Sequence, residues 1–141
     1  SQRKENRNMI EILKELRVIE ARVSALIQRI EAEAKAVTAT VGEIRRLAIL
    51  EEVYRKGGKA TPQEISDLAR KYHKTPSSSA GYYSGKAPSM SASADRRFRV
   101  LTETGNRIVQ ETREKWGEDW LDRVPMDIVG NDNTVDVEVA F

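Results

Sequence analysis

Cysteine is absent from the 141 residues of this chain, and histidine occurs once. Without cysteine there is no disulfide framework, no thiol nucleophile and no thiolate ligand for a metal. A single imidazole, His73, and no pair of carboxylates inside an apolar segment leave few groups for acid–base or nucleophilic catalysis. We therefore expect no enzymatic activity, no cofactor and no metal site, and we expect His73 to be a solvated or capping residue in a turn.

Long apolar runs and phosphate-binding glycine loops are missing as well. No apolar stretch approaches the ~18 residues of a membrane-spanning helix, so no membrane partner is expected. No signal peptide is recognised. Gly57-Gly58-Lys59 lacks the preceding strand and the residue spacing of a phosphate-binding loop. The sequence is therefore typical of a cytoplasmic protein.

The charged residues are divided unevenly along the chain. Residues 1–115 contain 23 Lys or Arg against 15 Asp or Glu, which leaves a net charge of +8. Residues 116–141 contain only Arg123 against seven acidic residues, which leaves a net charge of −6. A basic surface attracts polyanions. The sequence thus indicates a polyanionic partner for the first part and an acidic tail after it.

The first part of the chain, from about Glu5 to about Val41, contains neither glycine nor proline. Within it, apolar residues recur about every 3.5 positions: Met9, Ile12, Leu16, Ile19, Val23, Leu26 and Ile30. Sustained heptads of this kind are typical of a coiled coil. We predict an oligomerisation helix over residues 1–42, which at ~1.5 Å per residue is roughly 60 Å long.

The apolar stripe of this helix requires a partner helix, because an isolated helix would expose the stripe to water. The stripe either folds back onto its own domain or pairs with a second copy, and we expect the second, most simply as a homodimer. Leu13 and Ile27 flank the stripe and widen it, which leaves the number of strands open. In a parallel dimer Glu15 would meet Glu20, a mild argument for an antiparallel pair, and the orientation also stays open.

Residues 43–120 show the pattern of a small helical domain. The buried stripe of its first helix consists of Ile44, Leu47, Ala48, Leu50, Val53 and Tyr54. This helix ends at Gly57-Gly58. Thr61 and Glu64 have the spacing of a capping box, so a second helix begins there. A third, short helix that begins at a proline is predicted near residues 76–84.

The stretch "RRFRVLTETG", residues 96–105, joins a strand to the start of a helix. Phe98 and Val100 alternate with arginines, as in a half-buried strand. Thr102 then caps a helix with an apolar inner face.

Three helices, a hairpin and a further helix in this order resemble the winged helix-turn-helix domain. The "LTETG" of Leu101–Gly105 looks like the LT-x-x-G junction between wing and helix that is common in MarR-like and PadR-like transcription regulators. The resemblance covers roughly residues 43–116 and departs from the family in the third helix, which is short and contains Gly81. The expected fold class is mainly α with a small β wing: a long N-terminal coiled-coil helix followed by a winged helix-turn-helix domain.

The last residues, 121–141, show no helical period. Apolar residues alternate with acidic ones up to the end of the chain: Val135, Val137, Val139 and Phe141. Alternation predicts a strand, and "GNDN" before it predicts a turn. We expect an acidic C-terminal strand or tail, either as a terminal hairpin or as an added edge strand. The resemblance does not account for it.

Basic residues dominate the window from Arg70 to Arg99, which contains seven Lys or Arg and one acid, Asp95. The resemblance implies that the helix near 76–84 enters the major groove and that the wing, residues 86–99, follows the phosphate backbone. The serines at the start of that helix can donate to phosphates or base edges. The residues expected at the DNA are Arg70, Lys71, Lys74, Ser77, Ser78, Ser79, Tyr83, Lys86, Arg96, Arg97 and Arg99.

Some of these residues also have structural alternatives. The serines are equally typical of caps and turns. Arg99 can pair with Asp95 or with the acidic tail. Tyr82 and Tyr83 cannot both lie on one narrow buried helix face, so we expect one in the core and the other at the DNA.

The sequence predicts a dimeric protein that binds double-stranded DNA, acts as a transcription regulator and is located in the cytoplasm with the nucleoid. The alternative is a structural or adaptor protein, or a nucleoid or partition protein, that uses the long helix and the winged helix for protein–protein assembly. Binding to duplex DNA that weakens steeply with salt distinguishes the two.

Overall fold

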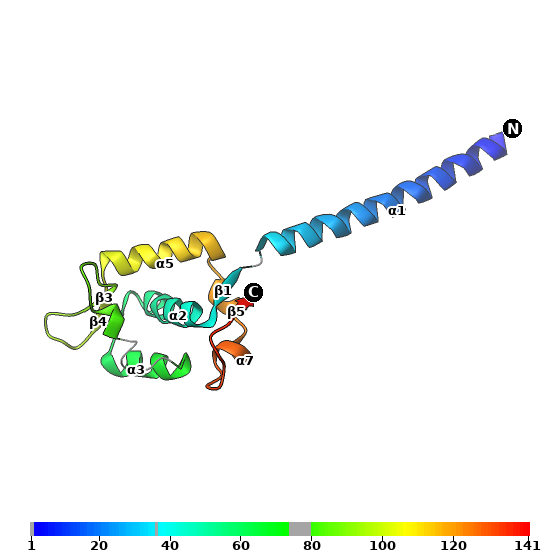
Figure 1. Cartoon of the computed structure of the whole chain (residues 1–141). Helices are drawn as coiled ribbons and strands as arrows, with labels where there is room; N and C mark the ends of the chain where they lie inside the picture. Colours follow the sequence, from blue (N-terminus) through cyan, green and yellow to red (C-terminus); the bar gives the residue numbers. More distant parts are fainter. Residues whose placement is uncertain (1, 36, 74–79) are drawn as a thin grey trace. The chain divides into compact units, whose positions relative to one another are not determined.

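The computed structural model of the chain describes residues 2–35, 37–73 and 80–141. It consists of two units, Ser1–Ala36 and Val37–Phe141, called here the N-terminal and the C-terminal unit. Helices predominate, and the strands are short and antiparallel (Figure 1). The expectation of a mainly helical chain with a long N-terminal helix and a small β element is therefore confirmed. None of the helices in the described ranges has the length and apolar character needed to cross a lipid bilayer.

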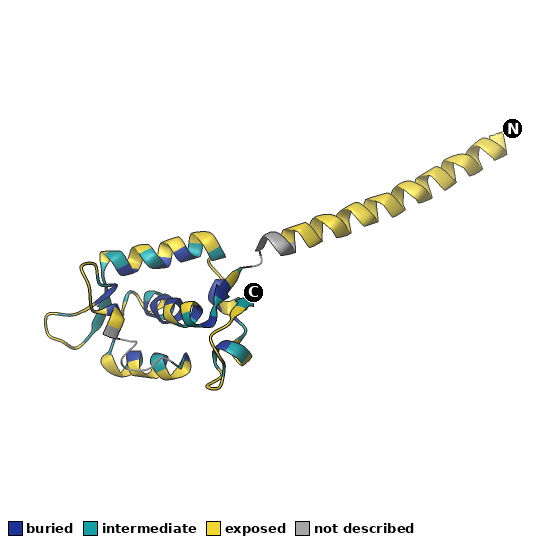
Figure 2. Cartoon of the chain, in the orientation of Figure 1, coloured by how far each residue is buried: buried dark blue, intermediate teal, exposed yellow. Residues whose placement is uncertain are grey.

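The N-terminal unit is a single helix, α1, which spans Gln2–Lys35. Its apolar seam, the seven residues from Met9 to Ile30 identified above, is exposed throughout (Figure 2). The prediction that the helix continues to residue 42 is wrong, because Thr38–Thr40 form a strand, β1. Threonine is β-branched and favours extended backbone where a partner strand is available.

The partner of β1 is β5 (Glu138–Ala140), which pairs with it antiparallel and aligns Ala140 with Thr38. The predicted C-terminal strand is thus present as an added strand, although it covers only the end of the alternating segment. Phe141 follows it and packs edge-on against Trp116, with the ring centroids 5.6 Å apart. The acidic tail is therefore part of the C-terminal unit.

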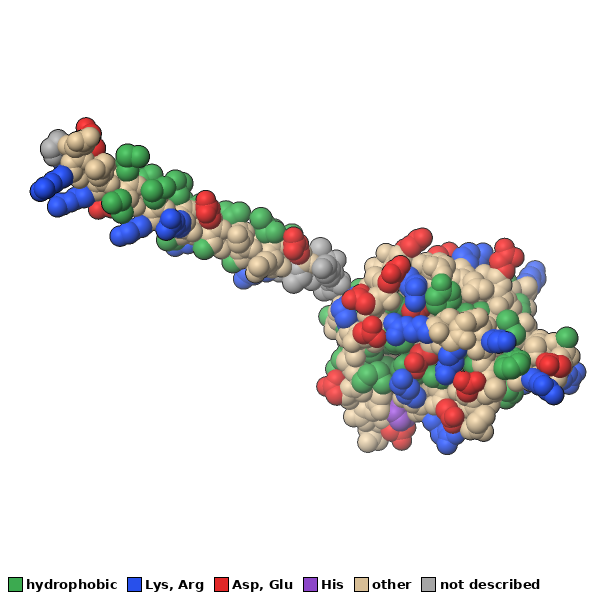
Figure 3. Space-filling view, turned by 180° about the vertical axis from the view of Figure 1, so that it is seen from behind, with side chains coloured by type: hydrophobic (Ala, Val, Ile, Leu, Met, Phe, Trp, Pro, Cys, Tyr) green, Lys and Arg blue, Asp and Glu red, His purple; other side chains and the backbone are tan. Residues whose placement is uncertain are grey.

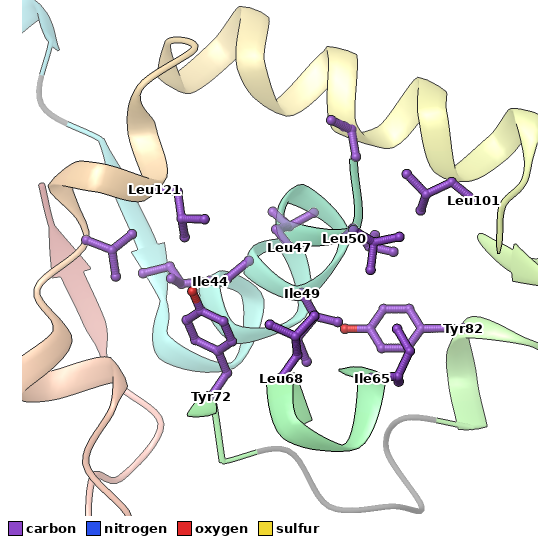
Figure 4. Close-up of a cluster of buried hydrophobic side chains, with 14 of the residues drawn as sticks. Ile44, Leu47, Ile49, Leu50, Ile65, Leu68, Tyr72, Tyr82, Leu101 and Leu121 are labelled. Atoms are coloured by element: carbon purple, nitrogen blue, oxygen red, sulfur yellow. The ribbon is translucent and has the colours of Figure 1, made fainter. Parts of the chain in front are cut away.

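Helix α2 (Val41–Arg55) lies at the centre of the C-terminal unit. It begins at Thr40, whose side chain accepts a hydrogen bond from the backbone nitrogen of Glu43. Its buried face contacts α3 (Pro62–Lys71) and α5 (Glu103–Trp116). The side chains of this core include Ile44, Leu47, Ile49, Leu50, Ile65, Leu68 and Leu101 (Figure 4).

Helix α3 begins with the predicted capping box. The Thr61 hydroxyl accepts a hydrogen bond from the Glu64 backbone nitrogen at 3.1 Å, and the Glu64 carboxylate accepts one from the Thr61 backbone nitrogen at 2.9 Å. The hydrogen bonds from the Thr61 backbone and from Lys56 lower the pKa of Glu64 to about 2. The start of this helix is therefore determined by local hydrogen bonds that the sequence already indicates.

The predicted third helix, near residues 76–84, is observed only in part. Residues 74–79 lie outside the described part of the chain. A single 3₁₀ turn, η1 (Ala80–Tyr82), follows them, and residues 83–84 are not helical.

Three short strands form an antiparallel sheet in the order β2-β4-β3: β2 (Lys59–Ala60), β3 (Met90–Ala92) and β4 (Arg99–Leu101). Helix α5 follows β4 at once, and the Thr102 hydroxyl accepts a hydrogen bond from the Gly105 backbone nitrogen at 3.1 Å. The predicted cap and helix of "RRFRVLTETG" are confirmed, and so is the strand, although it begins only at Arg99, so that residues 96–98 lie in the loop. Two short helices, α6 (Trp120–Arg123) and α7 (Met126–Val129), lead from α5 towards β5.

Gly105, the last residue of "LTETG", allows α5 to begin close to the residue that precedes β3. A Cβ atom at Gly105 would lie 2.1 Å from the backbone oxygen of Ser89. The same oxygen accepts a hydrogen bond from the Thr102 backbone nitrogen at 3.0 Å, so it cannot easily move away. A glycine is therefore required where the hairpin meets α5.

Candidate nucleic-acid interface

The predicted wing, residues 86–99, overlaps a hairpin of β3, β4 and the loop between them, and from here on the name wing is used for this hairpin, residues 90–101. The loop is closed by a hydrogen bond from the Ser93 backbone nitrogen to the Phe98 oxygen, 2.9 Å long. At its tip one oxygen of the Asp95 carboxylate accepts hydrogen bonds from the Ser93 hydroxyl at 2.7 Å and from the Arg97 backbone nitrogen at 3.1 Å. A carboxylate that accepts from the backbone two residues later stabilises a tight turn. The tip is thus held by its own short side chains.

Two arginines project from this tip. Arg96 has a φ of +60° within the turn, and both Arg96 and Arg97 are exposed. The Nε atom of Arg97 lies 3.9 Å from Asp95, while 80% of the Arg97 side chain remains accessible. The hydrogen bonds from Ser93 and from the Arg97 backbone lower the pKa of Asp95. Asp95 therefore offsets one positive charge without covering either arginine.

Lys59 is missing from the residues predicted to contact DNA, yet it lies beside the wing. Strand β2 pairs with β4, and Lys59 is aligned there with Val100. The Lys59 ammonium lies 4.8 Å from the centroid of the Phe98 ring, and its charge contributes to the lowered pKa of Asp95. The pairing joins segments far apart in the sequence, so no local pattern indicates it.

Tyr83 and Arg99 lie together at the base of the wing. Burial raises the pKa of the Tyr83 hydroxyl, and the charge and hydrogen bond of Arg99 oppose that shift. Tyr82 is buried, and its hydroxyl donates to the Arg46 backbone oxygen at 2.8 Å. The expectation that only one of the two tyrosines lies in the core is confirmed. Among the described residues Arg99 forms no ion pair with Asp95 or with the acidic tail.

The basic residues at the end of α3 already have acidic partners. Arg70 lies 2.6 Å from Asp67, and the Lys71 ammonium lies 3.0 Å from Glu52. The Arg70–Asp67 pair is exposed and therefore weak and screened by salt, whereas the Glu52 side chain is only 21% exposed. Both pairs reduce the free positive charge at this end of the helix. Lys86 is exposed in the loop before β3.

Lys59 and Arg97 both act on the Asp95 carboxylate at the wing tip, and Arg96 is exposed next to Asp95 in the chain. On the face shown in Figure 3, Lys and Arg are interspersed with Asp and Glu over the C-terminal unit. The remaining predicted contacts lie outside the described residues: Lys74, Ser77, Ser78 and Ser79. The wing is therefore the part of the predicted interface whose geometry is defined.

His73 contacts the C-terminal segment. One ring nitrogen, Nε2, is 2.6 Å from the Gly130 backbone oxygen, and the other, Nδ1, is 3.3 Å from the Asp132 carboxylate. The residue is half-buried and has a φ of +53°. Its two contacts hold the end of α3 against the segment after α7. Within the described residues, no three His, Asp or Glu side chains are grouped so that they could hold a metal ion.

The acidic C-terminal segment contacts α2. The Asp136 carboxylate accepts a hydrogen bond from the Gly42 backbone nitrogen at 2.8 Å, and Asp122 lies 3.2 Å from Arg55. A carboxylate at the first turn of a helix is favourable, because the unpaired backbone N–H groups carry partial positive charge. Asp122 and Asp136 thus help to hold the tail on the rest of the C-terminal unit.

Comparisons of the chain with protein-family models, with curated proteins and with solved structures give no significant match. The residues and the geometry of the wing are therefore the basis on which a function can be inferred.

Proposed function

We propose that the C-terminal unit is a winged helix-turn-helix domain and that the protein binds double-stranded DNA as a homodimer to regulate transcription. The support from the fold is the order α2, β2, α3, η1, β3, β4, α5, together with a three-stranded sheet in the order β2-β4-β3. This order is compatible with the helices and hairpin that the sequence resemblance implies, with the 3₁₀ turn η1 at the described part of the predicted third helix.

The observation that carries the proposal is the construction of the wing tip. Arg96 and Arg97 extend from a turn that Asp95 and Ser93 hold in place, and the Lys59 ammonium lies against the Phe98 ring that follows them in the chain. Cations on a hairpin of this kind neutralise phosphates and release counterions, which gives affinity that falls steeply with salt. In the proposal the segment near residues 76–84 contacts the major groove, and the wing fixes the register on the backbone.

The homodimer is supported by the apolar seam of α1. The seam residues are each about half exposed or more, and a helix with such a stripe is stable in water when a second helix covers it. Two copies joined in this way carry two C-terminal units, so their combined affinity for DNA exceeds that of one.

A mobility-shift titration with duplex DNA at ~50 and ~200 mM salt tests the proposal, because the number of phosphates neutralised determines the salt dependence. The variant is Arg96→Gln/Arg97→Gln, and the matched control is Arg107→Gln/Lys115→Gln, which removes two exposed charges from α5. We expect the wing variant to lose affinity for all sequences alike and to reduce the salt slope by about two, and the control to retain both.

Absence of a salt-sensitive shift in the unmodified protein contradicts DNA binding. Capture of a protein partner that persists at high salt, together with the absence of a shift, supports the structural or adaptor alternative instead. Equal losses in the wing variant and in the α5 control contradict the assignment to the wing, although not DNA binding itself.

A further inference from the structure

The apolar seam of α1 has no cover among the described residues. The exposed fraction of its side chains ranges from 48% for Leu16 and Val23 to 63% for Met9 and Ile30. The residues that flank such a seam determine which helix covers it and in which direction that helix runs.

Reading the seam as heptads places its residues at the two core positions. Position a holds Met9, Leu16, Val23 and Ile30, and position d holds Ile12, Ile19 and Leu26. The flanking position g then holds Glu15, Arg22 and Arg29, and Glu20 is the charged residue at the flanking position e. These four charges lie at the edges of any helix that covers the seam.

A parallel and an antiparallel pair bring different charges together. In a parallel pair, position g lies beside position e of the next heptad, so Glu15 of each copy meets Glu20 of the other and the like charges repel. In an antiparallel pair, position g lies beside position g, so Glu15 of each copy meets Arg22 of the other and the charges attract. The flanking charges therefore disfavour the parallel pair by repulsion and favour the antiparallel pair by attraction.

Two antiparallel registers join apolar side chains in every core layer, and the flanking charges distinguish them. When Leu16 is opposite Ile19 of the second copy, Ile12 meets Val23 and Met9 meets Leu26. A shift by one heptad, with Leu16 opposite Leu26, also keeps the layers apolar and brings Glu15 beside Arg29, but it places Arg22 beside Arg22 and Glu20 beside Glu20, which repel. The charges therefore favour the register with Leu16 opposite Ile19.

We infer that α1 pairs with α1 of a second copy in antiparallel orientation, with Leu16 opposite Ile19 and Glu15 beside Arg22. This inference rests on the homodimer of the proposed function. The carboxyl ends of the two helices, to which the C-terminal units are attached, then lie roughly 50 Å apart at ~1.5 Å per residue.

Cysteine cross-linking tests the orientation directly, because the chain contains no cysteine of its own. Met9→Cys and Leu26→Cys are prepared as separate proteins. The two proteins are mixed, left until their subunits have exchanged, and then oxidised. In the antiparallel register Cys at position 9 faces Cys at position 26, whereas two copies of position 9 are roughly 26 Å apart along the axis. We expect the mixture to form a disulfide-linked dimer at least ~10-fold more readily than either variant alone, since a disulfide needs Cα atoms within about 7 Å.

A parallel pair gives the opposite result: each single variant cross-links to itself, and the mixture shows no preference for the mixed dimer. That outcome overturns the inference, and so does a sedimentation experiment in which the full chain is monomeric at micromolar concentration. DNA binding is measured separately on the reduced variants. If no DNA is bound while the mixed cross-link forms, the proposed function fails and the antiparallel pair stands.

A charge reversal provides a second, independent readout. Glu15→Arg places Arg beside Arg22 in the antiparallel pair but beside Glu20 in a parallel pair. We expect this variant to weaken self-association at least ~3-fold, as repulsion between like flanking charges requires. The matched control is Glu11→Arg, which makes the same charge change away from the seam and should leave association unchanged. Tighter association of Glu15→Arg contradicts the antiparallel pair.

Discussion

The ammonium group of Lys59 in β2 lies 4.8 Å from the centroid of the Phe98 ring, which directly precedes the neighbouring strand β4. Lys59 is exposed and Phe98 is half-buried. A cation–π contact at an exposed site contributes about 0.5–1 kcal/mol, which is enough to orient the side chain but not to hold the strand. The Phe98 ring therefore holds the Lys59 ammonium beside the wing, where the proposed function requires a positive charge.

Replacement of Lys59 by Gln should weaken duplex binding for all sequences alike and reduce the salt slope by about one, because one phosphate contact is lost. Mobility shifts over a series of salt concentrations measure both quantities. Lys115→Gln on α5 is the matched control and should leave the slope unchanged. If the two variants behave identically, Lys59 does not contact the DNA.

Asp95 has two effects on the wing, and two substitutions separate them. Asp95→Asn keeps the oxygen that accepts from Ser93 and from the Arg97 backbone but removes the negative charge, so duplex affinity should rise. Asp95→Ala removes the charge and the turn together, so its affinity should be lower than that of Asp95→Asn. Fluorescence anisotropy with a labelled duplex gives both values. An Ala variant that binds as tightly as the Asn variant would show that the turn has no role.

Gly105→Ala should destabilise the C-terminal unit by about 3 kcal/mol, as overpacking against backbone does. The added Cβ would lie 2.1 Å from the Ser89 oxygen, which cannot move without loss of its hydrogen bond from Thr102. Urea unfolding followed by circular dichroism measures the change. Gly81→Ala is the control, because no described atom lies within 4 Å of its Cβ and its φ is not left-handed. A tolerated Gly105→Ala would contradict the close approach of α5.

The Glu51 carboxylate is 1% exposed and lies 2.8 Å from Arg113, which joins α2 to α5. Arg113→Met should cost about 3 kcal/mol, because it removes the nearer partner of a buried carboxylate. Replacing both residues by apolar ones, Glu51→Leu/Arg113→Met, should recover part of that loss, since no buried charge remains. Free energies of unfolding from urea titration compare the three proteins. A double variant less stable than Arg113→Met would show that the pair itself is required.

Glu64 should make the stability of the C-terminal unit depend on pH in the acid range. Its pKa in the folded protein, about 2, lies below its ordinary value of 4.5, so its stabilising effect is complete above the ordinary value. The effect is lost as the pH falls towards the folded pKa. Urea unfolding at pH 7 and at pH 3 measures it. The difference between the unmodified protein and Glu64→Gln should be larger at pH 7, and an equal difference at both pH values contradicts the prediction.

Local signals were sufficient for several parts of the fold and for part of the candidate site. The spacing of Thr61 and Glu64 predicts a capping box that the structure contains, and Thr102 predicts the start of α5 correctly. The apolar residues Val100 and Leu101 predict the strand β4 that follows the two arginines, although the turn that holds Arg96 and Arg97 was not predicted. In each case the partners are within a few residues of one another, so the hydrogen bonds can be inferred from neighbours in the sequence.

Contacts between distant segments could not be predicted in this way. The helix predicted to reach residue 42 ends at Lys35, because Thr38–Thr40 find a partner strand at the opposite end of the chain. Lys59 reaches the wing only through the pairing of β2 with β4. Lys71 is predicted from the sequence to contact DNA, but its ammonium lies 3.0 Å from the Glu52 carboxylate on another helix.

The sequence by itself determined the helix caps, the amphipathic seam of α1 and the sign of the charge on the wing, because each depends on residue types at short, regular spacings. Only the tertiary structure decided which strands pair, which cations keep their charge free, and why position 105 must be glycine. Those outcomes depend on which segments meet once the core around α2 has formed. Every residue has a backbone oxygen, so the sequence does not indicate that the one of Ser89 lies against Gly105.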